Sequence, residues 1–187
     1  MNNMEPILQL IENYSLDAPF LLSIDGRSAS GKTTLAMQLA DVWQYNIIHM
    51  DDFYLPFNRR TPKQMALPGG NIDFERLINE VLLPLKSGEN VTYQPYDCHN
   101  NIFYPERFLD GEKCTILEGS YSCHPCLQEY LDLKVFMDIS PDLQKERLLK
   151  RNPDALEAFF STWIPREEYY FNVCEIRNSC NLILNNL

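Results

Sequence analysis

The sequence GRSASGKT at residues 26–33 decides the fold, because it matches the pattern G-x-x-x-x-G-K-[ST] at every fixed position. It follows an apolar run, FLLSID at residues 20–25, and precedes LAMQLADVW, which has the composition of a helix. Gly26 and Gly31 allow backbone conformations that turn several N–H groups toward one anion, and the positive end of the following helix adds to the attraction. This segment is therefore predicted to be a P-loop, a loop that holds the phosphates of a nucleotide.

The residues of the motif have expected roles toward ATP or GTP with Mg²⁺. Lys32 is expected to bridge the outer phosphates, and Thr33 to supply a hydroxyl ligand to Mg²⁺, while Thr34 reaches the inner phosphate. The alternative, a glycine-rich turn that only caps a helix, is a poor explanation of a complete motif between a strand and a helix. The predicted nucleotide-binding residues are Gly26, Ser28, Ala29, Ser30, Gly31, Lys32, Thr33 and Thr34.

Short apolar runs alternate with helix-length segments along the chain, which predicts parallel strands joined by helical crossovers. The nearly continuous apolar character of the runs suits a sheet that helices cover on both faces. With 187 residues and no repeat or linker, the chain is predicted to be one α/β domain over residues 1–187. Strands are expected at residues 20–25, 46–50, 114–118, 133–139 and 182–185, and helices at residues 31–43, 73–83, 141–151 and 166–178.

Two segments interrupt this alternation. Residues 55–72 are punctuated by proline and glycine and are predicted to form a long loop, which is more often functional than idle. Arg59, Arg60 and Lys63 in this loop are expected to be solvated, with binding of an anionic acceptor as the alternative. Residues 91–104 alternate enough to predict a short hairpin.

Charge and cysteine content narrow the partners and the compartment. A net charge of −10 and a pI of about 4.7 repel polyanions, which argues against nucleic acid and anionic membranes as partners. No apolar stretch approaches the ~18 residues of a membrane span, and the N-terminal residues lack a signal-peptide pattern, so a cytoplasmic protein is expected. The six cysteines include Cys123 and Cys126 in CHPC, for which a redox or zinc site is the alternative to ordinary reduced thiols. Because no second pair has metal-ligand spacing, ordinary thiols are expected.

Acidic residues end two of the apolar runs, at the sheet edge where open α/β proteins bind ligands. Asp51 and Asp52 follow one run, and Glu118 closes another. Asp51 is expected either to accept a proton from a substrate hydroxyl or to cap a turn, and the local sequence leaves both open. Because burying an unpaired carboxylate is costly, acids at two strand ends beside a P-loop indicate a shared Mg²⁺. Its predicted ligands are Thr33, Glu118 and Asp51.

The chain resembles the uridine kinase and phosphoribulokinase family of P-loop kinases in six segments, which are, in order, GRSASGKTT, MDDFYLP, GNIDFERL, YQPYDC, ILEGSY and KVFMDISPDLQKERLLKR. The resemblance runs from about residue 20 to residue 184, and the succession of SASGKTT, DDFY and LEG is far more selective than a P-loop alone. It implies a P-loop NTPase fold with a mostly parallel five-stranded sheet, a substrate-side hairpin and a flexible helical lid at about residues 150–166.

The resemblance also implies roles for residues outside the P-loop. Asp51 matches the family's base toward the 5′-hydroxyl of a sugar, and Glu118 matches the acid associated with Mg²⁺. Arg147 and Arg151 share one face of a predicted helix and match the arginines that open the lid, with a solvated helix face as the alternative. Arg166 is a weaker candidate for the lid. The implied acceptor-binding residues are Asp51, Tyr54, Asp73, Tyr96, Asp97 and Arg147.

The resemblance predicts an ATP-dependent kinase that phosphorylates a hydroxyl of a nucleoside or a related small molecule, with Asp51, Lys32, Arg147 and Arg151 as catalytic residues. Two departures concern the acceptor: the hairpin lacks the family's histidine at its expected place, and the loop at 55–72 is longer. The alternatives are a kinase for a phosphorylated sugar or a pantothenate-like alcohol, and a nucleotide-dependent regulatory ATPase. The sequence does not decide between ATP and GTP, or between a monomer and a homo-oligomer.

Overall fold

Five parallel strands form the central sheet, in the order β2-β7-β1-β8-β9. The computed structural model describes residues 4–14 and 19–186. β1 lies in the middle of the sheet, so the loop that follows it emerges between the ends of two neighbouring strands. All five predicted strands are confirmed. Their bounds are β1 Leu21–Gly26, β2 Asn46–His49, β7 Thr115–Glu118, β8 Leu133–Ile139 and β9 Leu182–Asn186.

Helices cover both faces of the sheet, and strand alternation divides the core into two clusters. Leu22 and Ile24 of β1 point to one face, where they pack with residues of α1 Met4–Asn13 and α2 Lys32–Trp43. Leu21 points to the other face and joins Phe53 and Tyr170 in the second cluster. This second face carries α8 Ile164–Val173 and the short α9 Ile176–Ser179. The sheet is therefore buried on both sides, as its apolar runs predict.

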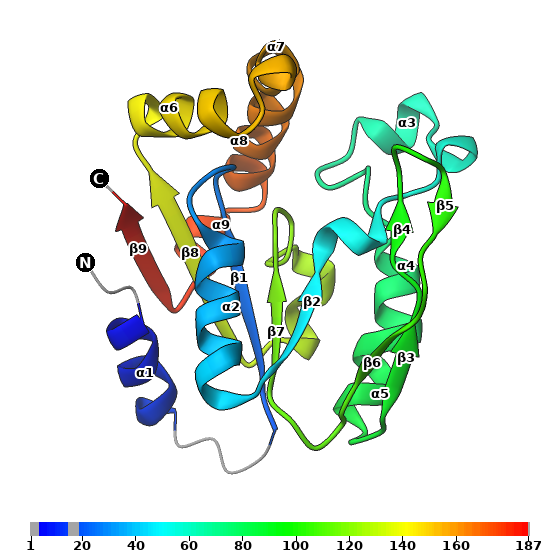
Figure 1. The fold of residues 1–187 in the computed structure, drawn as a ribbon, viewed down its shortest axis with the longest axis vertical. Helices are drawn as coiled ribbons and strands as arrows, with labels where there is room; N and C mark the ends of the chain where they lie inside the picture. Colours follow the sequence, from blue (N-terminus) through cyan, green and yellow to red (C-terminus); the bar gives the residue numbers. More distant parts are fainter. Residues whose placement is uncertain (1–3, 15–18, 187) are drawn as a thin grey trace.

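The hairpin on the acceptor side is longer than the predicted range of 91–104. β3 Val91–Tyr93 pairs with β6 Arg107–Leu109, and β4 Tyr96–Asp97 pairs with β5 Ile102–Phe103 at the tip. The base of the hairpin therefore reaches Leu109, because Val91 and Leu109 are both buried and pair across it. Figure 1 shows this hairpin beside the central sheet, on the side of β2.

Two predicted helices have different bounds because each contains a proline. The helix expected at 73–83 runs through α4 Phe74–Leu77, a π turn at Ile78–Leu82 and α5 Leu83–Lys86. The helix expected at 166–178 starts earlier, after a second π turn at Phe159–Trp163, and ends where Glu175 turns left-handed with φ 48°. Pro84 and Pro165 each lie two residues beyond a π turn, whose wider hydrogen bonding accommodates a residue without an N–H.

Short helical turns occupy the remaining segments around the carboxyl ends of the strands. The predicted loop at 55–72 contains a 3₁₀ turn at Phe57–Arg59 and α3 Pro62–Met65, so it is partly helical. The predicted lid segment, residues 150–166, follows α6 Pro141–Arg151 and contains α7 Leu156–Ala158. Figure 1 places α6, α7 and α8 together above the carboxyl ends of the strands. Across residues 4–14 and 19–186, no helix is long and apolar enough to cross a bilayer.

Candidate active site

The backbone of the P-loop has the conformation that its glycines permit. Gly26, Ala29 and Gly31 have φ values of 137°, 62° and 101°. A Cβ atom at Gly26 would lie 2.1 Å from the carbonyl oxygen of Met137, because the loop passes directly against the backbone of β8. Only glycine avoids both the steric overlap and the unfavourable φ. The predicted loop therefore sits between β1 and the start of α2, with the helix amino terminus at its end.

Lys32 lies within the loop that it is predicted to serve. Its side chain is buried, and Nζ donates hydrogen bonds to the carbonyl oxygens of Gly26 at 2.7 Å and Arg27 at 2.9 Å. The ammonium group is thus held over the backbone of the loop and not in solvent. This position supports the predicted role of Lys32 as a phosphate ligand, because bound phosphates can replace these two carbonyl acceptors.

Thr33 and Glu118 meet at the start of α2 and the end of β7. The Thr33 hydroxyl lies 3.1 Å from both carboxylate oxygens of Glu118, which is buried. A hydroxyl beside a carboxylate fits Mg²⁺, a cation that prefers oxygen ligands and keeps waters or phosphates in its remaining positions. No group of three or more His, Cys, Asp or Glu residues in the described chain is arranged to hold a metal ion. A Mg²⁺ ion here would therefore depend on the nucleotide phosphates as well as on Thr33 and Glu118.

His49 completes this corner of the site and was missed by the sequence reasoning. Its Nδ1 lies 2.6 Å from Oε1 of Glu118, and the hydrogen bond to Glu118 raises the pKa of the imidazole. The ring therefore fixes the carboxylate that also contacts Thr33. The available signal was the position of His49, two residues before Asp51 at the end of a predicted strand.

Asp51 and Asp52 are neighbours with different environments. Asp52 is buried and accepts hydrogen bonds from the Tyr93 hydroxyl at 2.8 Å and from Arg107 at 2.7 Å, so it attaches the hairpin to the end of β2. Asp51 is exposed, with the Tyr54 hydroxyl as a hydrogen-bond partner. Protein around the Asp51 carboxylate reduces its hydration and raises its pKa, and the nearby negative charge of Glu118 raises it further. Asp51 is thus the acid of this pair that remains accessible to a substrate.

The two predicted lid arginines have different positions. Arg147 on α6 donates to the carbonyl oxygens of Ala29 at 3.1 Å and Ser30 at 3.4 Å. Arg151 is exposed, and its Nε contacts the side chain of Asn152. Gln144, which the sequence reasoning did not identify, donates to the carbonyl of Ser28 at 3.0 Å. α6 therefore holds the outer side of the P-loop through Arg147 and Gln144, while Arg151 stays outside the site.

The implied acceptor-binding acids are engaged within the protein. Asp73 is buried, caps α4 through the N–H of Arg76, and forms an ion pair with Arg59 at 2.5 Å. Asp97 accepts hydrogen bonds from the Tyr104 hydroxyl and the Asn100 side chain, and these donors lower its pKa. The carboxylates of both residues are thus occupied by donors from their own segment.

The arginines of the acceptor-side loop are also engaged. Arg60 donates from Nε to the carbonyl of Leu55 at 2.6 Å, while Arg59 pairs with Asp73. Arg59 is nevertheless 51% exposed, as expected for a solvated side chain, whereas Arg60 is half-buried, and both side chains brace the folded loop. Lys63 is exposed, as expected. Tyr96 is buried, and its hydroxyl donates to Asn101 at 2.7 Å, which makes it part of the hairpin's own packing.

A cavity of about 280 Å³ separates the acceptor-side loop from α8. Leu67 and Asn71 line it from the loop, Thr162 and Arg166 from the lid segment and α8, and Tyr121 from the segment after β7. Among the described residues that line it, neither Asp51 nor Tyr54 is present. An apolar wall with a few convergent polar groups is typical of a small-molecule site.

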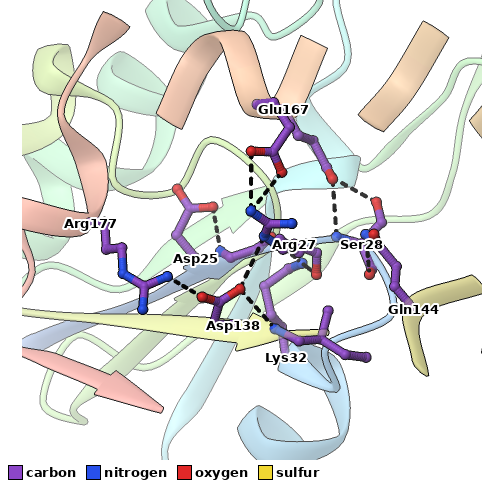
Figure 2. Close-up of polar contacts among 11 residues, drawn as sticks. Asp25, Arg27, Ser28, Lys32, Asp138, Gln144, Glu167 and Arg177 are labelled. Atoms are coloured by element: carbon purple, nitrogen blue, oxygen red, sulfur yellow. Dashed lines mark hydrogen bonds and ion pairs between the residues drawn. The ribbon is translucent and has the colours of Figure 1, made fainter. Parts of the chain in front are cut away.

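Glutamates of α8 contact the P-loop directly, a feature that the sequence reasoning missed. Glu167 is buried and accepts hydrogen bonds from the backbone N–H of Ser28 at 3.0 Å, the Ser28 hydroxyl at 2.7 Å and the Ser120 hydroxyl at 2.6 Å. Glu168 forms an ion pair with Arg27, which also pairs with Asp138 of β8. Figure 2 shows Glu167 above the loop, opposite Ser28 and Gln144.

The cysteines form no disulfide and differ in their surroundings. All six are free. Cys123 is buried, with its sulfur 3.2 Å from the Ser23 hydroxyl and 3.9 Å from the sulfur of Cys180, and burial raises the pKa of its thiol. Cys126 contacts only the neighbouring His124 among the hydrogen-bond partners of its side chain in the described residues. CHPC is thus part of a packed turn.

Comparison with known proteins agrees with this geometry. Residues 21–157 match the model of the phosphoribulokinase / uridine kinase family. Mouse uridine-cytidine kinase-like 1 is 32% identical over 143 residues, which cover 71% of this chain and 26% of that protein. Uridine kinase-like protein 3 from Arabidopsis thaliana is 28% identical over 155 residues, which cover 77% of this chain and 33% of that protein. The chain thus spans about a quarter to a third of the length of these two relatives.

Solved structures share the fold along nearly the whole chain. A structure described as a possible uridine kinase from Bacillus stearothermophilus superposes with a TM-score of 0.71 at 21% identity, over 96% of each chain. D-glycerate 3-kinase from Cryptococcus neoformans superposes with a TM-score of 0.59 at 15% identity, over 87% of this chain and 84% of that one. At these identities the likeness shows the P-loop kinase fold alone. Because the family model matches residues 21–157, which is most of the chain, the chain belongs to the phosphoribulokinase / uridine kinase family.

Proposed function

We propose that the protein is an ATP-dependent kinase that transfers the γ-phosphoryl group to a hydroxyl of a small molecule. The observation that carries this proposal is the arrangement around one sheet edge. Lys32 lies over the P-loop, Thr33 contacts Glu118, and the accessible Asp51 follows the neighbouring strand. A phosphate ligand, a Mg²⁺ site and a carboxylate that a substrate can reach are the parts that phosphoryl transfer requires.

Each side chain has a role in that reaction. Thr33 and Glu118 would hold Mg²⁺, which neutralises phosphate charge when it is bound, and Lys32 would neutralise charge on the outer phosphates. Asp51 accepts the proton of the acceptor hydroxyl as its oxygen bonds to the γ-phosphorus and the bond to the ADP oxygen breaks. The raised pKa of Asp51 suits a group that binds a proton during the reaction. Arg147 keeps the P-loop in shape by donating to its carbonyl groups.

A nucleoside is the first candidate for the acceptor. The names of the relatives support it, since the two curated relatives described above are named as uridine kinase-like proteins. The cavity between the acceptor-side loop and α8 is lined by aromatic and apolar side chains together with Asn71 and Arg166, and its volume suits a small molecule.

An acceptor with an anionic group is a second candidate. Arg166 supplies a cation to the cavity wall, whereas Asp73, the implied sugar-binding acid, is already paired with Arg59. A phosphorylated sugar or a pantothenate-like acid would place its anionic group at Arg166 and its hydroxyl toward Asp51.

A screen of nucleosides, sugar phosphates and vitamin-like alcohols for acceptor-dependent ADP formation tests the proposal. We expect one acceptor class to stimulate ADP formation well above the acceptor-free rate, and Lys32→Ala to abolish the stimulation. Arg166→Gln distinguishes the two candidates, because it should raise the KM of an anionic acceptor and leave that of a nucleoside nearly unchanged. ADP formation that no acceptor increases would contradict the kinase assignment and favour a nucleotide-dependent ATPase.

A further inference from the structure

Side chains of α6 and α8 contact the P-loop from two sides. On one side, Gln144 and Arg147 of α6 donate to three of its carbonyl groups, those of Ser28, Ala29 and Ser30. On the other side, Glu167 of α8 accepts from the N–H and the hydroxyl of Ser28. The two sides differ in chemistry, because α6 supplies donors to carbonyl groups whereas α8 supplies a negative charge to a loop built to bind anions.

The Glu167 carboxylate has the surroundings of a bound anion. It accepts three hydrogen bonds, two from Ser28 in the P-loop and one from Ser120 in the segment that follows β7. β1 and β7 are adjacent in the sheet, so these two segments border the same gap at its carboxyl edge. Glu118, the candidate Mg²⁺ ligand, lies only two residues before Ser120. The phosphates of a nucleotide, ADP included, that is held by the P-loop and by Mg²⁺ at Glu118 would border this gap.

A carboxylate and a phosphate cannot share that gap without strong repulsion. Glu167 is only 4% exposed, so water screens its charge poorly. The donors that now satisfy Glu167, an N–H and two hydroxyl groups, are equally suited to phosphate oxygens. These donors can therefore bind either the Glu167 carboxylate or a nucleotide phosphate, but not both at once.

We infer that Glu167 is an internal anion that occupies part of the nucleotide's phosphate site, and that nucleotide binding displaces it together with the first turns of α8. This inference rests on the proposed use of the P-loop for a nucleotide. Nucleotide binding exchanges the hydrogen bonds of Glu167 for bonds to phosphate, with no covalent change.

The fold couples this exchange to the lid segment. α8 continues directly from the π turn at Phe159–Trp163, so a shift of Glu167 moves the chain that lines the acceptor cavity at Thr162 and Arg166. Further along α8, the Tyr170 hydroxyl donates to the buried Asp25 at 2.7 Å, which ties this part of the helix to the end of β1. The helix can thus pivot near Tyr170 while its first turns leave the loop. Displacement of Glu167 by a nucleotide would therefore also change access to the acceptor cavity.

The first test measures MgADP binding by calorimetry in the wild type, Glu167→Gln and Glu157→Gln. Glu157 is an exposed glutamate of α7 and takes no part in the P-loop contacts described above, so its variant is a control with the same change in net charge. Glu167→Gln keeps the shape of the side chain but removes the competing charge. We expect it to bind MgADP roughly tenfold more tightly, which corresponds to one charge-assisted hydrogen bond, and Glu157→Gln to match the wild type. Ser120→Ala removes one of the three bonds to Glu167 and should strengthen binding by a smaller factor, about threefold.

The second test follows the helix itself. Trp163 lies next to the start of α8, and Trp43→Phe removes the other tryptophan of the chain. In that background, MgADP should change the fluorescence of Trp163, and Glu167→Gln should show much of this change before nucleotide is added.

The outcomes separate this inference from the proposed function. If the wild type binds MgADP but Glu167→Gln and Ser120→Ala, both folded by circular dichroism, bind it equally or more weakly, Glu167 is not a competing anion. A Trp163 signal that MgADP leaves unchanged would also overturn the inference. If neither the wild type nor the variants bind MgADP, the nucleotide site itself is wrong, and the inference falls with it.

Discussion

The backbone of Gly26 is constrained both by its conformation and by its surroundings. Its φ of 137° is unfavourable for any residue with a side chain, and an added Cβ would lie 2.1 Å from the Met137 carbonyl oxygen. We expect Gly26→Ala to lower the free energy of unfolding by about 2–4 kcal/mol, from the sum of overpacking and backbone strain. Urea denaturation at equilibrium measures this loss.

Gly88→Ala is the matched control for that prediction. Gly88 also has a positive φ, 76°, but nothing lies within 4 Å of an added Cβ. Gly88→Ala should therefore introduce backbone strain alone and lower the free energy of unfolding by about 1 kcal/mol. Equal losses of unfolding free energy at the two positions would show that steric overlap with β8 adds nothing to the effect of Gly26→Ala.

His49 contacts the candidate Mg²⁺ ligand rather than the metal. Its hydrogen bond to Glu118 orients a carboxylate that also contacts Thr33. Loss of such a supporting contact commonly weakens metal binding by about 10- to 100-fold. We therefore expect His49→Asn to raise the Mg²⁺ concentration for half-maximal ADP formation by at least about tenfold, with little change in the maximal rate. An unaltered Mg²⁺ titration would leave His49 with a packing role only.

Asp25 connects three elements through one buried carboxylate. It accepts hydrogen bonds from the N–H of Gly26 at the end of β1, the N–H of Cys123 after β7, and the Tyr170 hydroxyl on α8. Burial outweighs these donors and raises the pKa of Asp25 from 3.8 to about 6. The folded state therefore binds the proton more tightly than the unfolded state. As the pH rises from about 4 to about 6, the contribution of Asp25 to stability falls.

Asp25→Asn should reveal this loss, since asparagine does not ionise. The free energy of unfolding of the variant minus that of the wild type should therefore be up to about 3 kcal/mol larger at pH 7 than at pH 4. Urea denaturation of both proteins at the two pH values measures this difference. A difference that is the same at both pH values would contradict a raised pKa at Asp25.

The sequence predicts the strands and helix cores well because their apolar periodicity is strong. The bounds of two helices were wrong for a physical reason: a proline ordinarily ends a helix, but a π turn before Pro84 and before Pro165 lets each helix continue. The predicted hairpin was too short, because its base depends on the pairing of Val91 with Leu109. This contact closes a long loop, and local sequence patterns do not encode it.

Across the whole molecule, the P-loop could be predicted from its motif, and the proximity of Thr33 to Glu118 from their places at the carboxyl ends of parallel strands. The contacts of the other polar side chains could not be predicted from the sequence. Arg59 pairs with Asp73, and Glu167 crosses from α8 to Ser28, 139 positions away in the sequence. Such contacts arise only when distant elements pack together, so a single sequence gives no spacing from which to infer them.

The division of labour between Asp51 and Asp52 tests the kinase assignment most directly. Asp51 is exposed beside Tyr54, whereas Asp52 is buried and bound to Tyr93 and Arg107. Asp52→Asn should lower the melting temperature, because it weakens the attachment of the hairpin, and Asp51→Asn should leave the melting temperature nearly unchanged.

The decisive measurement is the rate of acceptor-dependent ADP formation by Asp51→Asn, with MgATP affinity determined on the same sample. The proposed role of Asp51 predicts a rate that is lower by about 10²- to 10⁴-fold, with MgATP affinity close to that of the wild type. An undiminished rate would show that another group receives the proton and that the phosphoryl-transfer site is assigned to the wrong carboxylate.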